Sequence, residues 1–228
     1  HRGLVGSEMW IRDRPQGAVC SPVLFLLYSN GSKYFVEEGI EYSGFADDIA
    51  LWGSGRNVRD IRERLQRALE KIDEWALEMK IGLNPDKSEC CVFTRDNAEK
   101  AMELKLKVAG REIETKKEIL FLGITIDSGL TFRSHVEKVC EKVRKRVAIL
   151  RALGGTTWGW DSEGLRKVYV VMVETVVWYA SPAWMPWLSK SRLEEVERAQ
   201  REGLRAVTGL TKTSPEEAVY LEAGVDPI

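Results

Sequence analysis

The sequence predicts an α+β fold in which antiparallel strands with packed helices precede a bundle of helices. Two short apolar runs flank an Asp-Asp pair within residues 42–52, a pattern typical of two strands joined by a tight turn. From Val58 to Met79, apolar residues recur at three- and four-residue steps, as in an amphipathic helix. The pattern then becomes mainly helical after residues 128–131, where we place a domain boundary.

Composition places the chain among ordinary globular proteins. Its 228 residues are 44% hydrophobic and 30% charged, which is sufficient for a sizeable core. The longest apolar candidate for a membrane span, Val168 to Ala180, contains Glu174, so we expect no membrane partner. The four cysteines form no Cys-x-x-Cys pair and the two histidines lie far apart, so we expect reduced thiols and no zinc site.

Asp47 and Asp48 are the candidate catalytic residues and metal ligands. The flanking apolar runs place them at the tip of a hairpin. Two carboxylates held there on a rigid scaffold form an oxygen-rich site that suits Mg²⁺, or Mn²⁺ in its place. A bare Asp-Asp pair is more often a solvated acidic turn, so the interpretation depends on the motifs around it.

Further motifs accompany this pair in order along the chain. Pro15-Gln16-Gly17 indicates a turn, and Ser21-Pro22 begins an apolar helix that we expect to be mostly buried. Leu83-Asn84-Pro85-Asp86-Lys87 follows the amphipathic helix. Phe121-Leu122-Gly123-Ile124 lies within a predicted strand, and other strands are predicted at 88–94 and 104–108.

Together with the Phe-Ala-Asp-Asp box at residues 45–48, these motifs resemble the palm of a reverse transcriptase, in particular that of non-LTR (LINE-type) retrotransposons. The resemblance implies nucleotidyl transfer by an RNA-directed DNA polymerase with two Mg²⁺ ions. Its partners would be an RNA template, a DNA primer and deoxynucleoside triphosphates, in the cytoplasm or nucleus. Residues 14–128 would form a partial palm, and residues 129–228 a helical thumb or connection. The oligomeric state stays open.

The resemblance also assigns roles to single residues. Asp47 would bridge the metal ions with support from Asp48, and Lys87 would be a basic residue near the nucleotide phosphates and a candidate proton donor to pyrophosphate. An exposed loop lysine without a role is an equally good interpretation of Lys87. The remaining assignments are Pro15, Gln16, Gly17, Phe45 and Ala46 at the nucleotide and template, and Phe121, Leu122 and Gly123 at the end of the primer.

The C-terminal part is predicted to form a bundle in which Ser134, Ser191 and Ser214 each start a helix through a capping box. The stretch Leu165 to Tyr179 is apolar nearly all round and should be the central buried helix. We expect five tryptophans to belong to the bundle core: Trp158, Trp160, Trp178, Trp184 and Trp187.

A basic patch stands out against the net charge of -1, which by itself argues mildly against binding of nucleic acid. Residues 132–151 hold seven basic residues against two glutamates. The resemblance implies that the thumb holds the primer–template duplex through phosphate contacts. The candidate residues are Lys138, Lys142, Arg144 and Lys145, and a solvated charged face is the alternative.

Residues 1–13 differ from what precedes Pro-Gln-Gly in the resembled family, so we expect a foreign or mis-assembled leader. The family's third catalytic carboxylate and its basic fingers segment lie upstream of that motif, and we therefore predict that this fragment alone is inactive. The alternative function is a degenerate or domesticated palm–thumb remnant that binds RNA or RNA–DNA duplex without catalysis. A purely structural protein would have to carry the ordered motifs by chance.

Overall fold

The computed structural model describes residues 20–29, 38–94, 96, 99, 102–155 and 158–228. Within them, the chain divides into two compact units. Unit 1 takes the chain up to Cys90 together with Met102–Thr115, and unit 2 takes Cys91–Ala101 together with Lys116–Ile228. The structure contains both helices and strands, which confirms the predicted α+β class. The finer division into palm and thumb stays a prediction.

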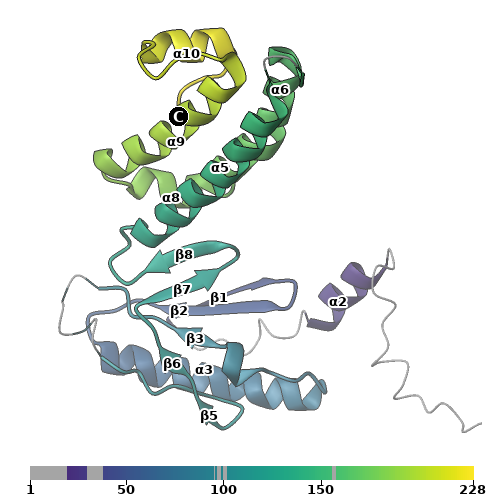
Figure 1. Ribbon diagram of the computed structural model, residues 1–228. Coiled ribbons are helices and arrows are strands. Elements are labelled where there is room, and N and C mark those ends of the chain that lie inside the picture. The colour runs from purple at the N-terminus through teal and green to yellow at the C-terminus, as the bar shows by residue number, and fades with distance from the viewer. Residues whose placement is uncertain (1–19, 30–37, 95, 97–98, 100–101, 156–157) are drawn as a thin grey trace, which may run out of the picture. The chain divides into compact units, whose positions relative to one another are not determined.

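The hairpin of unit 1 consists of β1 (Ile40–Phe45) and β2 (Asp48–Gly53), paired antiparallel in continuous register. After it comes the predicted amphipathic helix, α3 (Val58–Glu78). It begins at Asn57, whose side chain accepts a hydrogen bond from the Arg59 amide. This helix contacts β1, β2 and β4 (Figure 1). Its buried face consists of Ala68, Ile72, Trp75 and Ala76. The helix therefore supports the hairpin from one side.

The other strands of unit 1 are short. β3 (Glu89–Cys90) pairs in parallel with β6 (Glu114–Thr115), and β4 (Lys107–Val108) pairs antiparallel with β5 (Arg111–Glu112). Among the described residues the strands form four two-stranded ladders rather than one antiparallel sheet, which corrects the predicted arrangement. Lys105 and Ala109 both have φ of 48°, and such left-handed residues interrupt the extended chain.

The helix α2 (Ser21–Ser29) begins at the predicted Ser-Pro pair. Val23, Leu24 and Leu27 are 59–69% exposed, however, so the prediction of a mostly buried helix is wrong for these residues. The Tyr28 hydroxyl donates a hydrogen bond to the carbonyl oxygen of Met79 at the end of α3. An apolar sequence predicts a helix here but does not show which face of that helix packs against the rest of the protein.

Unit 2 combines a second hairpin with the helical bundle (Figure 1). β7 (Glu118–Phe121) and β8 (Ile124–Asp127) pair antiparallel and precede α5 (Arg133–Leu153). α6 (Ser162–Tyr169) continues through the π-helical η3 (Val170–Glu174) into α7 (Thr175–Val177). The chain then forms α8 (Ser181–Trp184), η4 (Met185–Trp187), α9 (Lys190–Thr208) and α10 (Glu216–Ala223).

The bundle core lies where α5 and α9 run side by side in the same direction. The Cys140 thiol contacts the Glu195 carbonyl oxygen at 3.7 Å, and farther along both helices Arg151 lies 3.6 Å from Glu202. Apolar residues recur at helical spacing along α5 and are all buried: Val136, Val139, Val143, Val147 and Leu150. On α9, Val196, Leu204 and Val207 are buried in the same way.

The helix starts differ from the predicted capping boxes. α5, α9 and α10 follow Phe132, Ser189 and Pro215, and none of the three has a side-chain cap hydrogen bond. Ahead of α5, the Asp127 carboxylate accepts hydrogen bonds from the amides of Thr131 and Phe132 at 3.1 and 2.6 Å. The Asp127 carboxylate at the end of β8 therefore accepts hydrogen bonds ahead of the helix, the capping role that the sequence predicted for Ser134. Ser134 itself lies inside α5.

The stretch Leu165 to Tyr179, predicted as the central buried helix, is less buried than predicted. It lies within Ser162–Trp187, whose length and composition alone would allow it to cross a membrane. Ser162–Trp187 is interrupted by π-helical turns, however, and by Ala180 in the left-handed region. Tyr169, Val173 and Val177 face the core at helical spacing, whereas Val171 is 68% exposed. The segment therefore has one buried face rather than being buried all round.

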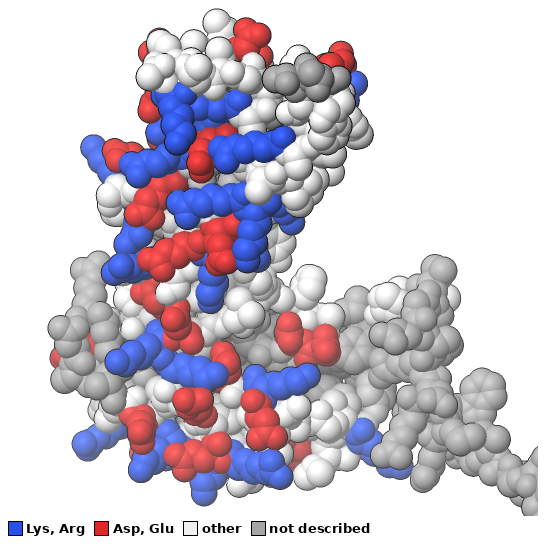
Figure 2. All heavy atoms as spheres, in the orientation of Figure 1, with Lys and Arg blue, Asp and Glu red and all other residues white. Residues whose placement is uncertain are grey.

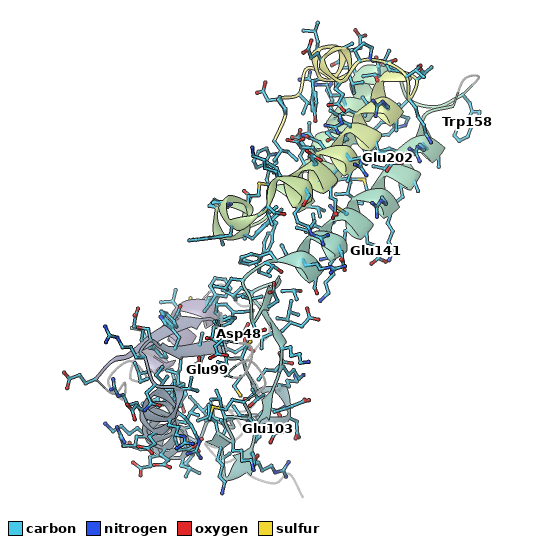
Figure 3. All side chains as sticks on the ribbon, turned by 90° about the vertical axis from the view of Figure 1, so that its left-hand side faces the viewer. Asp48, Glu99, Glu103, Glu141, Trp158 and Glu202 are labelled. Atoms are coloured by element: carbon cyan, nitrogen blue, oxygen red, sulfur yellow. The ribbon has the colours of Figure 1, made fainter. Side chains whose placement is uncertain are left out.

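Four of the five tryptophans predicted to be core residues are exposed. Trp158, Trp160, Trp178 and Trp187 are 46–69% exposed, and only Trp184 is fully buried. Trp178 directly follows the buried Val177 and so falls outside the stripe that faces the core. Trp158 projects from the turn that follows α5 (Figure 3).

His135 connects the second hairpin with the core. Its Nδ1 accepts a hydrogen bond from the Thr125 amide at 3.3 Å, and its ring packs edge-on against Trp184 with 5.0 Å between centroids. Burial, and then the nearby charges of Lys142 and Lys138, lower the pKa of His135 below its ordinary value of 6.5. The folded protein therefore favours the neutral imidazole.

We expect unit 2 to lose stability as the pH falls below about 6.5. His135 then becomes protonated in the unfolded chain but stays neutral in the folded protein, where its pKa is lower. Each unit of pKa difference corresponds to about 1.4 kcal/mol. Urea unfolding followed by circular dichroism between about pH 7.5 and pH 5 measures the effect. His135→Gln should flatten this pH dependence, and an equal loss of stability in both proteins would contradict the assignment.

Candidate active site

The Asp pair lies at the tip of the β1–β2 hairpin, as the sequence predicts. Phe45 pairs with Asp48, so Ala46 and Asp47 are the two turn residues and Asp48 is the first residue of β2. Ala46 has φ of 52°, a left-handed conformation that costs a residue with a Cβ atom about 1–2 kcal/mol. The paired strands on both sides hold this turn in place.

Both carboxylates are accessible. Asp47 and Asp48 are exposed, and Figure 3 marks Asp48 on the hairpin. In the described part of the chain, no three His, Cys, Asp or Glu side chains gather as a metal cluster. Mg²⁺ does not require one, because it keeps several waters and binds through one or two carboxylates together with substrate phosphates. The donor set therefore fits Mg²⁺ in the presence of a phosphate-bearing substrate.

Exposed and half-buried aromatic side chains lie along the hairpin that carries the carboxylates. Phe45, which pairs with Asp48, is 63% exposed. Farther from the tip, Trp52 is 43% exposed and Tyr42 and Leu51 are half-buried. A Cβ atom on Gly44 would lie 2.6 Å from the Tyr42 hydroxyl, so glycine leaves room for that ring. An exposed aromatic ring beside two carboxylates can contact a base or sugar while the acids face charged groups.

Lys87 ends the 3-10 turn η2 (Pro85–Lys87) in the same unit. The Asn84 side chain starts this turn by accepting a hydrogen bond from the Asp86 amide at 3.1 Å. Lys87 is exposed, and no hydrogen bond or ion pair between described residues joins it to Asp47 or Asp48. The proposed role of Lys87 therefore stays a prediction.

Phe121, Leu122 and Gly123 lie at the β7–β8 turn. Leu122 and Gly123 have φ of 45° and 80°, and the Tyr179 hydroxyl donates a hydrogen bond to the Leu122 carbonyl oxygen at 2.9 Å. A Cβ atom on Gly123 would lie 3.2 Å from the Tyr179 ring. Tyr179 therefore ties this turn to the bundle, a role that no sequence signal near residue 122 reveals. Pro15, Gln16 and Gly17 lie outside the described residues.

The four basic residues predicted for α5 have different surroundings. Lys138 donates a hydrogen bond to the Thr125 hydroxyl at 3.0 Å, and Lys145 lies 2.7 Å from Glu141. Lys142 and Arg144 are exposed, and only Arg144 lines a groove between α5 and α9. Over these helices Figure 2 shows basic side chains in rows that alternate with acidic ones.

Comparison with known proteins places the sequence in a family. A sequence profile of the reverse transcriptase (RNA-dependent DNA polymerase) family matches residues 11–126. The chain belongs to this family. The matched range includes the Asp pair, Lys87 and the β7–β8 turn. Reverse transcriptases act on RNA templates and nucleotides and generally use divalent metal ions.

Several retrotransposon proteins are similar to this chain. The RNA-directed DNA polymerase from mobile element jockey of Drosophila funebris is 24% identical over 201 residues, which is 86% of this chain and 22% of that protein. The Pol polyprotein from type-1 retrotransposable element R1 2 of Nasonia vitripennis is 24% identical over 175 residues, 75% of this chain and 42% of the relative. The R1 Pol polyprotein of Bradysia coprophila is 25% identical over 228 residues, 99% of this chain and 22% of the relative.

These relatives confirm the resemblance to non-LTR retrotransposon enzymes. The chain spans 22–42% of the length of the three. No solved structure matches it.

Proposed function

We propose that this chain is part of a retrotransposon RNA-directed DNA polymerase and that the β1–β2 tip belongs to its nucleotidyl-transfer site. One observation carries the proposal. Two exposed carboxylates lie at the tip of a paired hairpin, within the residues that match the reverse transcriptase family. The hairpin fixes the acids, and their exposure leaves them open to substrate phosphates.

The proposed reaction joins a deoxynucleotide to a DNA primer copied from an RNA template. The primer 3′-hydroxyl attacks the α-phosphate, so a new P–O bond forms while the bond to pyrophosphate breaks. When bound, Mg²⁺ stabilises the attacking and leaving oxygens. Asp47 holds the ions with support from Asp48, and Lys87 donates a proton toward the leaving pyrophosphate.

The other residues position the substrates in this proposal. Phe45 and Ala46, with the Pro-Gln-Gly turn at residues 15–17, contact the nucleotide and template. The β7–β8 turn, held by Tyr179, contacts the primer end. Residues 14–128 act as a partial palm and residues 129–228 as the thumb, a division that stays a prediction. The alternative, a remnant that binds without catalysis, is not favoured by relatives named as polymerases.

The test is extension of a DNA primer annealed to an RNA template by the enzyme whose reading frame contains this chain. We expect templated extension that stops when a chelator removes divalent ions and resumes when Mg²⁺ or Mn²⁺ is restored. We expect no extension by residues 1–228 alone. Duplex binding by the whole enzyme without extension in either metal would support the remnant instead.

A further inference from the structure

The turn between β7 and β8 has a backbone conformation that its own sequence does not favour. Leu122 and Gly123 are its two central residues, and their φ angles are 45° and 80°. Positive φ at both central positions is typical of a type I′ turn, which favours Asn-Gly or Gly-Gly. A leucine followed by glycine suits a type II turn better, because only the second central residue then has positive φ. Contacts from outside the turn must therefore stabilise the observed conformation.

Tyr179 of the helical bundle supplies such a contact. Its hydroxyl donates a hydrogen bond to the Leu122 carbonyl oxygen at 2.9 Å. This carbonyl belongs to the peptide bond between the two central residues, so the hydrogen bond fixes the orientation of that peptide. A Cβ atom on Gly123 would lie 3.2 Å from the Tyr179 ring, so the ring also packs against the second central residue. One side chain therefore contacts both centres of the turn.

Tyr179 is itself held by the buried part of the bundle. Its carbonyl oxygen accepts a hydrogen bond at 3.1 Å from Nε1 of Trp184, which is fully buried. Trp184 packs against His135, and the His135 ring accepts a hydrogen bond from the Thr125 amide in β8. In Figure 1, α8 lies at the end of the bundle nearest the hairpin. These contacts lead from the turn through the bundle core and back to β8.

The position of Tyr179 in the sequence does not reveal this role. Tyr179 lies beyond residues 11–126, the range that matches the reverse transcriptase family. Its side chain is 55% exposed, and an exposed aromatic residue by itself indicates no function. The hydrogen bond to a backbone carbonyl 57 positions earlier in the chain distinguishes it from other surface aromatic residues.

We propose that Tyr179 is a positioning residue for nucleotidyl transfer, which holds the β7–β8 turn in the conformation that orients the primer 3′-hydroxyl for attack. The inference rests on the proposed function, in which this turn contacts the primer end. Tyr179 acts through Leu122 and Gly123 and takes no part in the chemistry. A small misplacement of a reacting group slows a reaction even when binding is unchanged. Loss of the Tyr179 hydroxyl should therefore lower the rate of incorporation rather than the affinity for the primer.

The test is single-turnover incorporation of one deoxynucleotide into a DNA primer annealed to an RNA template, by the enzyme whose reading frame contains this chain. Tyr179→Phe removes only the hydroxyl. At saturating Mg²⁺, nucleotide and duplex, we expect the maximal rate to fall about tenfold. The dissociation constants of the duplex and of the nucleotide should change by less than about twofold, as expected when orientation rather than ground-state binding is lost.

The matched control is Tyr220→Phe in the same unit. The Tyr220 hydroxyl donates a hydrogen bond to Oε1 of Gln200 at 3.2 Å, so this variant also loses one tyrosine hydrogen bond, between α10 and α9. It should keep the wild-type rate. Equal slowing by the two variants would overturn the proposal, because the effect would then reflect a general loss of bundle stability. Circular dichroism verifies that both variants fold.

A double-variant cycle tests whether Tyr179 acts through the turn. Gly123→Ala places a methyl group against the Tyr179 ring at a positive φ, so it disturbs the same turn from the other side. The combination of Tyr179→Phe with Gly123→Ala should be no slower than the slower single variant. Rate losses that multiply would contradict the proposal, because the two residues would then act independently.

Two further outcomes would overturn the inference. One is a wild-type rate in Tyr179→Phe, and the other is weaker duplex binding at an unchanged rate, which would make Tyr179 a binding contact. Both leave the polymerase assignment intact, because the wild-type enzyme still extends the primer. Absence of extension by the wild-type enzyme in either metal would overturn the polymerase assignment together with this inference.

Discussion

Asp47→Asn is expected to lower the rate of nucleotide incorporation by about a thousandfold or more in the enzyme that contains this chain. Asparagine has nearly the same size as aspartate but cannot supply the negative charge that holds a metal ion. Stabilisation of transition-state charge by a bound metal is worth several kcal/mol, and each 1.36 kcal/mol is a factor of ten in rate. Asp48→Asn should cause a smaller loss, because Asp48 has the supporting role.

The matched control is Asp60→Asn in the same unit. Asp60 is exposed in the first turn of α3, outside the motifs assigned to the site, so its replacement should cost less than about 1 kcal/mol of stability. Single-nucleotide incorporation at saturating Mg²⁺ measures the effect, with circular dichroism to verify folding. If Asp47→Asn incorporates nucleotides as fast as Asp60→Asn, the Asp pair is not the metal site.

The local parts of the structure could be predicted from the sequence. Aromatic and branched residues on both sides of an Asp-Asp pair define the β1–β2 hairpin, because strand and turn preferences act over a few residues. The valine stripe of α5 is likewise read from its spacing. The candidate catalytic pair could be predicted in the same way, because its two carboxylates belong to adjacent residues at the tip of one hairpin.

Features that depend on distant contacts could not be predicted in this way. Tyr179 reaches the Leu122 carbonyl across 57 positions of the chain, and Asp127 replaces Ser134 as the hydrogen-bonding group ahead of α5. Apolar composition also gave no means of separating Trp184 from the exposed tryptophans, because burial depends on which face of each helix meets a neighbour. The groove between α5 and α9 exists only once the two helices pack together.

Trp184→Ala is expected to destabilise unit 2 by about 3–5 kcal/mol, the usual cost of removing a large buried aromatic side chain. Trp184 is fully buried, its ring packs against His135, and its Nε1 donates a hydrogen bond to the Tyr179 carbonyl oxygen at 3.1 Å. The substitution would therefore leave a cavity and remove the hydrogen bond to the carbonyl of Tyr179, the residue that holds the β7–β8 turn. We expect that turn to loosen together with the bundle.

Trp187→Ala provides a control of identical chemistry three residues away. Trp187 is 69% exposed, so its removal should cost about 0.5 kcal/mol or less. Urea unfolding followed by far-ultraviolet circular dichroism compares the two variants without relying on tryptophan emission. Amide exchange in β7 and β8 would show whether the turn loosens only in Trp184→Ala. Similar destabilisation by both substitutions would contradict the packing described here, because burial is the main difference between the two side chains.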